Sequence, residues 1–230
     1  MSDKKDVVFF VADAAMEAVF REFLKRGHFA GRLHCADFSF DIARDPPSKD
    51  GGVYKRVHEL LKSFQHTHER TVVVLDKQFG NEGLKTDQVK SAIEENLRDS
   101  GWDDDHYAVV VIDPELEVWL WQDNAHVEQC LKYQGAKSLR ATLADSGEWP
   151  VDCLKPLQPK DCIQQLIRRN RAGVPTVVYT QIAAKVSVLA CQDAMFQALL
   201  AQLQTWFPLS YSSAPEVASR PQRPRRNISL

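Results

Sequence analysis

Several common signatures are missing from this chain of 230 residues, and each absence argues against a class of protein. Its five cysteines are odd in number, widely scattered and without a Cys-x-x-Cys pair, which argues against a disulfide framework and a structural zinc site. The apolar run near the start, VVFFVAD, is too short for a signal-peptide core or a membrane span. We therefore expect a cytoplasmic protein with reduced, buried cysteines and no membrane partner.

An excess of charge of either sign is also missing. Lysine and arginine total 29 against 31 aspartate and glutamate residues, so the net charge is -2. Any contact with nucleic acid must therefore come from a local patch rather than from a global basic field. No Walker, dinucleotide-binding or nucleophile-elbow motif is present. What remains is a globular chain long enough for one domain, or for one domain with a helical subdomain.

Three apolar runs of similar character are present, and each ends in an aspartate. They are VVFFVAD at 7–13, TVVVLDK at 71–77 and YAVVVIDPE at 107–115. Continuous rather than alternating hydrophobicity is typical of strands that are buried on both faces, as in a parallel sheet. A weaker candidate, RLHCADFSF at 32–40, alternates more and is expected nearer an edge.

Amphipathic stretches at 15–26, 54–64 and 86–99 separate these strands. Alternation of strand and helix predicts, over residues 1–124, an α/β domain with a mostly parallel sheet of about four strands flanked by helices. Helical stripes dominate residues 125–207, which predicts a helical C-terminal subdomain. The segment TVVYT at 176–180 fits either a strand or the start of a buried helix.

The last 23 residues, 208–230, are rich in proline, serine and arginine. Such a composition cannot bury enough apolar surface to fold alone. We therefore expect a tail that is either a disordered, solubilising end or a weak phosphate-binding arm.

Carboxylates gather where the predicted strands end. Asp13, Asp76 and Asp113 close the three strands, and Glu115 and Glu117 follow the last one. Ligands of open parallel sheets bind at the carboxyl ends of the strands, and clusters of oxygen ligands suit Mg²⁺ or Mn²⁺. A structural role competes with this interpretation, because an aspartate after a strand also caps helices, and the segment DPE that begins at Asp113 is typical of a helix start.

Two further features have a structural and a functional interpretation. Lys185 lies within an apolar helical stripe, so its ammonium either extends to solvent along that surface or reaches the acidic group or a substrate phosphate. Trp119 and Trp121 are either core residues or platforms on which a base stacks.

Three short segments resemble the Toprim-like proteins of bacterial phage-defence islands, and the components of methylation-associated defence systems are the most similar of these. The segments are VADAAMEAVFREFL, VVVLD and PELEVWLW, within a likeness that covers roughly residues 7–207. In Toprim domains a glutamate after the first strand and an Asp-x-Asp after a later strand bind Mg²⁺ for phosphoryl transfer. By position these correspond to Asp13, with Glu17 four residues later, and to Asp76 with Gln78. The chain departs from the pattern in two places, because its first acid is aspartate and the second acid of the pair is Gln78.

The resemblance implies a component of an antiphage defence system with a degenerate acidic site, which acts by binding other defence proteins in a multi-protein complex. The alternative is a Mg²⁺- or Mn²⁺-dependent nuclease or nucleotide-processing enzyme, whose partner is nucleic acid or a nucleotide. Gln78 favours the first function, and the retained acids favour the second. In the enzyme the predicted metal ligands are Asp13, Asp76 and Glu117, and the other predicted catalytic residues are Glu17, Glu115 and Lys185.

Overall fold

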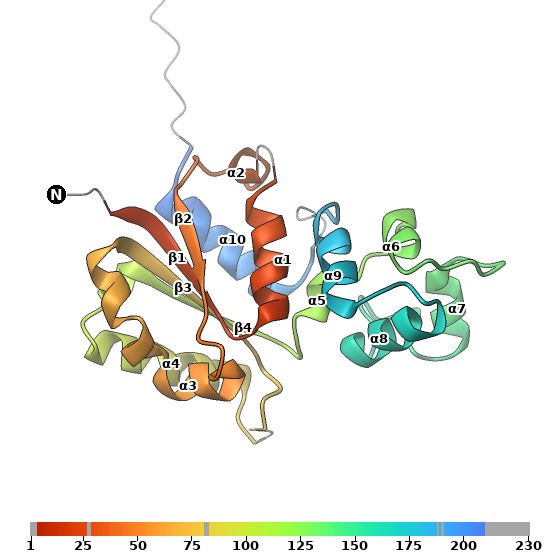
Figure 1. Ribbon diagram of the computed structural model, residues 1–230, viewed down its shortest axis with the longest axis horizontal. Helices are drawn as coiled ribbons and strands as arrows, with labels where there is room; N and C mark the ends of the chain where they lie inside the picture. The colour runs from red at the N-terminus through yellow and green to blue at the C-terminus, as the bar shows by residue number, and fades with distance from the viewer. Residues whose placement is uncertain (1–3, 27–28, 81–82, 188, 190, 210–230) are drawn as a thin grey trace, which may run out of the picture.

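A computed structural model describes residues 4–26, 29–80, 83–187, 189 and 191–209 of the chain. Within them, four parallel strands form one sheet in the order β2-β1-β3-β4 (Figure 1). The strands are β1 (Lys5–Val11), β2 (Phe40–Ala43), β3 (His68–Asp76) and β4 (Tyr107–Ile112). The predicted parallel sheet of about four strands is therefore confirmed, and the three apolar runs are its strands β1, β3 and β4.

Helices cover both faces of the sheet, which explains why its central strands are apolar along their length (Figure 1). Helices α3 and α4 pack on one face, and α1 and α10 pack on the other. These helices are α1 (Ala14–Leu24), α3 (Lys49–Leu60), α4 (Thr86–Asp99) and α10 (Ala194–Trp206). Residues 7–11 of β1 are at most 2% exposed, whereas β2 is partly exposed throughout, as an edge strand should be.

The remaining helices lie mostly beside the sheet, where they form a helical part of the molecule (Figure 1). They are α5 (Glu117–Leu120), α6 (Ala125–Cys130), α7 (Leu139–Asp145), α8 (Pro159–Arg169) and α9 (Pro175–Ala183). Helix α9 packs against α1, and this contact joins the helical part to the helices that cover the sheet, whereas α8 packs against α5 within the helical part. Three shorter elements complete the fold, namely α2 (Phe29–Arg32), η1 (Lys62–His66) and η2 (Asp104–His106). Among the described residues, no helix has both the length and the apolar character that a membrane crossing requires.

The weakest predicted strand is misplaced. Residues 32–40 do not form a strand, because α2 ends at Arg32 and β2 begins only at Phe40. The alternation in RLHCADFSF arises because Leu33 and Cys35 are buried against the core, and Cys35 forms an isolated bridge with Pro208. The segment TVVYT is a helix, since Pro175 supplies the first residue of α9.

The helical segment 125–207 does not stay together in space. Its last helix, α10, returns to the sheet and packs against β4, whereas α6 to α9 lie to one side (Figure 1). The proposed division at residue 124 stays a prediction. Of the predicted tail, residues 210–230 lie outside the described residues.

Helix α10 should contribute strongly to stability because it covers one face of the sheet. Leu203 is 2% exposed, so Leu203→Ala should lower the free energy of unfolding by about 2–5 kcal/mol through lost burial and the cavity left behind. Denaturant unfolding measures this change. The exposed Thr205 lies on the same helix, and Thr205→Ala should alter stability by less than about 0.5 kcal/mol. Equal effects of the two substitutions would show that α10 does not pack on the sheet.

Candidate metal centre

The carboxyl ends of β3 and β4 bring a group of acids to one edge of the sheet. Asp76 is the last residue of β3 and is only 5% exposed. Its Oδ1 accepts a hydrogen bond of 2.8 Å from the backbone N–H of Leu116, in the turn that follows β4. Because the strands are parallel neighbours, this bond fixes the acidic turn directly beside the end of β3.

Glu115 and Glu117 lie in this turn and at the start of α5. One carboxylate oxygen from each of Asp76, Glu115 and Glu117 lies within 4.8 Å of the other two. The helix begins at Glu117 rather than at Asp113, so the interpretation of the segment DPE as a helix start is wrong. Asp113 is exposed and accepts a hydrogen bond from the Thr86 hydroxyl at 2.8 Å.

The three carboxylates fit a hard divalent cation. Two oxygens on opposite sides of a Mg²⁺ ion are roughly 4.2 Å apart, twice the usual bond of about 2.1 Å. Distances within 4.8 Å therefore need only a small adjustment to converge on one ion. Glu117 is 3% exposed, and its Oε2 forms no hydrogen bond of good geometry within the described part of the chain, although the phenol of Tyr179 is close enough to lower the pKa of Glu117. A buried carboxylate oxygen without a partner is costly, and a cation would satisfy it.

Burial and mutual repulsion favour the protonated forms of these acids. Burial raises the pKa of Asp76 well above its usual range, and the charges of Asp50 and Glu117 raise it further. Burial also raises the pKa of Glu117, although the ammonium of Lys160 acts in the opposite direction. The group therefore carries negative charge at neutral pH only at a cost in stability, which a bound cation would remove.

Lys160, at the start of α8, is the cation next to this group. Its Nζ lies 3.0 Å from Oε2 of Glu115. Burial alone lowers the pKa of Lys160, but the acids around it, Glu117 first, outweigh burial and raise it. Tyr179 of α9 is close to Glu117, and burial, the charge of Glu117 and an interaction with its carboxylate all raise the pKa of the phenol. One lysine faces several carboxylates, so the site keeps an excess of negative charge.

Asp50 adds a further acid that the sequence analysis did not identify. It lies in the first turn of α3, and its Oδ1 accepts a hydrogen bond of 2.8 Å from the backbone N–H of Asp76. Burial raises the pKa of Asp50, and the charge of Asp13 adds to this. The start of α3 is tightly packed against the residue before it, Ser48. It requires glycine at position 52, because a Cβ there would lie 2.6 Å from the Cβ of Ser48.

A sequence signal for Asp50 does exist, whereas none exists for Lys160. A helix between two parallel strands runs back across the sheet, so its first turn lies at the carboxyl edge of the strands. An acid in the first turn of the helix before β3 is therefore a candidate. The position of Lys160 depends on how α8 packs against α5, which no local pattern predicts.

The predicted first acids, Asp13 and Glu17, do not belong to the group of three. Asp13 caps α1, since its Oδ1 accepts a hydrogen bond of 2.8 Å from the N–H of Met16. It is nevertheless close enough to raise the pKa of Asp76 and of Asp50. Glu17 accepts hydrogen bonds from two arginines, Arg44 at 2.6 Å and Arg21 at 2.8 Å, and the bond from Arg44 contributes most to lowering its pKa.

Two other residues from the sequence analysis are exposed and do not belong to the group of three carboxylates. The side chain of Gln78 is exposed, and its backbone N–H donates to the carbonyl of Pro114. Lys185 is exposed at the end of α9, where its charge lowers the pKa of the Cys130 thiol although burial raises it overall.

The two tryptophans of the predicted acidic segment are core residues. Trp119 is 2% exposed and Trp121 is fully buried, so neither offers a free face to a base.

Comparison with protein-family models and with curated proteins gives no match for this chain. A solved structure, the C-terminal region of the Burkholderia pseudomallei OLD protein, is similar to it. The alignment has a TM-score of 0.51 and 15% sequence identity, and it covers 88% of this chain and 98% of that chain. At this identity the likeness concerns the fold alone, and with the observed sheet it confirms the predicted α/β class of a parallel sheet flanked by helices, which is consistent with a Toprim-like fold.

The raised pKa values predict how stability depends on pH. A carboxyl whose pKa is higher in the folded state favours folding when it is protonated, so its contribution is lost as the pH rises above the ordinary carboxyl range of about 4. We expect the melting temperature of the metal-free protein to fall between about pH 5 and pH 8. The fall should be smaller in Asp76→Asn, because asparagine keeps an acceptor for Leu116 without the charge.

Glu69 provides a matched control for this experiment, because it is exposed and lies near the other end of β3. Glu69→Gln should leave the slope of melting temperature against pH unchanged. If the melting temperature of Asp76→Asn fell with pH as steeply as that of the wild type, this interpretation of the site would be contradicted.

Proposed function

We propose that this protein is a Toprim-like component of a bacterial antiphage defence system that binds Mg²⁺ or Mn²⁺ and processes phosphodiester or nucleotide substrates, as a nuclease would. The observation that supports this most is the group of three carboxylates at Asp76, Glu115 and Glu117, in which the buried Oε2 of Glu117 forms no hydrogen bond of good geometry among the described residues. The likeness to the OLD protein's C-terminal region supports the Toprim-like scaffold on which such a site is expected.

The ion would be held by Asp76 and Glu117, with Glu115 shared between the ion and Lys160. When bound, a divalent ion neutralises charge on phosphoryl oxygens and lowers the pKa of its water. The chain's own residues supply the rest. The N–H of Leu116 keeps Asp76 oriented, and the side chain of Lys160 is 40% exposed, so its ammonium can meet a substrate phosphate at the mouth of the site.

Asp13 and Asp50 would support the site without binding the ion directly. Asp50 positions Asp76 through the backbone N–H, and the negative charges of both aspartates strengthen the field that attracts a cation. The role of Asp13 as a direct metal ligand remains a prediction, and its present bond to Met16 is compatible with a second, free carboxylate oxygen.

A second candidate function is a component without catalytic activity that binds other defence proteins. Two observations favour it. Gln78 replaces the second acid of the Toprim pair and faces solvent, and Lys160 already provides Glu115 with an internal counter-ion. In this case the acidic group would have a structural or binding role, and no metal-dependent turnover would be detected.

The two functions are separated by substitutions at positions 76 and 78. If the protein is an enzyme, Asp76→Asn should abolish Mn²⁺-dependent cleavage of a nucleic acid, with a loss of about 100-fold or more, and should leave the fold intact. Gln78→Asp should strengthen Mn²⁺ binding several-fold through its added negative charge two residues after Asp76, although its exposed side chain does not belong to the group of three carboxylates. A nuclease assay and thermal melting with and without millimolar Mn²⁺ measure these effects.

Glu69→Gln again serves as the control and should keep full activity and the full metal-induced rise in melting temperature. Absence of both activity and a Mn²⁺-induced rise in the wild type would exclude the enzyme and leave the binding component. A rise without activity would keep the metal site and reject turnover on that substrate.

A further inference from the structure

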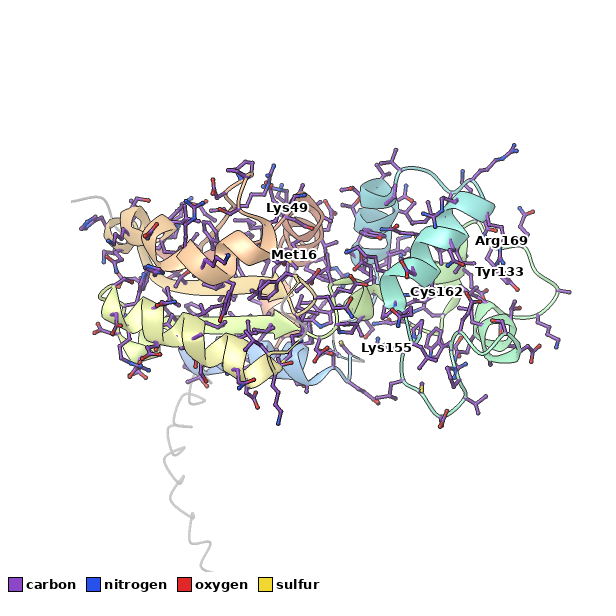
Figure 2. The ribbon with its side chains drawn as sticks, turned by 90° about the horizontal axis from the view of Figure 1, so that it is seen from below. Met16, Lys49, Tyr133, Lys155, Cys162 and Arg169 are labelled. Atoms are coloured by element: carbon purple, nitrogen blue, oxygen red, sulfur yellow. The ribbon has the colours of Figure 1, made fainter. Side chains whose placement is uncertain are left out.

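A cavity that is separate from the acidic group lies in the helical part of the molecule, and the cations that line it form no ion pair with any acid of the described residues. It has a volume of about 470 Å³. Its walls come from the segment after α5, from α7, from the loop before α8 and from the segment after α9. Figure 2 shows Lys155, one of its lining residues, near the place where the sheet-bearing part meets the helical part. Trp121 lines this cavity one turn after Glu117, so it lies close to the acidic group without sharing its residues.

Two cations line the cavity, and each is held by carbonyl oxygens. The Nζ of Lys155 donates to the carbonyl of Trp121. The guanidinium of Arg140 lies 4.6 Å from the centroid of the Trp149 ring and donates to the carbonyls of Trp149 and Pro150. Within the described ranges, neither cation forms an ion pair with a carboxylate. These bonds fix both charges in place and leave other donors of each group free.

The acids near the cavity are otherwise engaged or too exposed to neutralise it. Asp123 is the carboxylate among the lining residues, and its side chain is exposed. Asp193 raises the pKa of Lys155 slightly, but burial outweighs it and lowers that pKa overall. The Oδ1 of Asp193 accepts hydrogen bonds from Trp119 and from the N–H of Phe196. Partly buried cations without acidic partners are costly, and an anion would offset that cost.

From this arrangement we infer that the cavity between Arg140 and Lys155 binds a phosphate group, carried by a nucleotide or by a nucleic-acid strand. Guanidinium and ammonium groups together are the usual partners of phosphate. The volume exceeds what an inorganic ion needs and lies in the range of small-molecule sites. The amides of Gln122 and Asn124 are hydrogen-bonded within the chain, so the exposed amide of Gln192 is the lining amide that is placed to contact a base or sugar. This site requires no metal and does not depend on the proposed catalytic function.

The test is titration calorimetry on the full chain in EDTA, which removes divalent ions from the acidic group. Three probes distinguish the sources of phosphate, namely inorganic phosphate, a nucleoside monophosphate and a short single-stranded oligonucleotide. We expect at least one to bind, and we expect Lys155→Met to weaken that binding by about tenfold or more. The melting temperature should not fall in this variant, because methionine fills a similar volume without a buried charge.

Two further variants keep the test decisive. Gln192→Glu places a negative charge at an exposed position of the cavity wall and should weaken binding without any effect on folding, even if Lys155→Met folds poorly. Lys137→Met is the matched control, since Lys137 is an exposed lysine of the same helical part that pairs with Asp145 and does not line the cavity. Binding of the monophosphate identifies a free nucleotide as the source, and binding of the oligonucleotide alone identifies a strand. The inference is overturned if none of the probes binds, or if the two cavity variants bind as tightly as the control.

Discussion

The carboxylate of Asp76 and its own backbone N–H hold together the three segments from which the acidic site is built. Oδ1 accepts the N–H of Leu116 from the turn after β4, and the N–H of Asp76 donates to Asp50 at the start of α3. An ionised or a neutral carboxyl can accept the first bond, so the architecture does not need the charge. The charge itself is disfavoured by burial, which makes the site receptive to a cation.

The molecule places opposite charges near the two ends of α5, which begins at Glu117 and is followed by Trp121. Glu117, in the first turn of this helix, belongs to a group of three carboxylates, whereas the cavity beyond Trp121 is lined by cations that pair with no acid in the part of the chain that the structure describes. A divalent ion near one end and a phosphate near the other would each satisfy groups that the described chain leaves incompletely paired. Such an arrangement would suit the proposed function, because it would bring phosphate-containing ligands close to the proposed metal centre.

The sequence predicted the parts of this structure that depend on local pattern. Continuous apolar runs identified β1, β3 and β4, and the acids at their ends led to Asp76 and Glu117. Strand β2 was misplaced because it is short and partly exposed, so its composition carries little signal. The pairing of Glu17 with Arg44 joins two elements distant in the chain, and the approach of Lys160 depends on tertiary packing. Neither contact follows from periodicity or spacing.

Anomalous diffraction from a crystal soaked in Mn²⁺ tests the central claim most directly, because it locates the ion without any assumption about activity. The account predicts a peak within about 2.5 Å of carboxylate oxygens from both Asp76 and Glu117, the distance expected for direct ligation. It also predicts that Glu117→Gln removes the peak, since an amide is a weaker ligand than a carboxylate. A well-ordered site with no peak there at saturating Mn²⁺, or a peak that persists in Glu117→Gln, would contradict it.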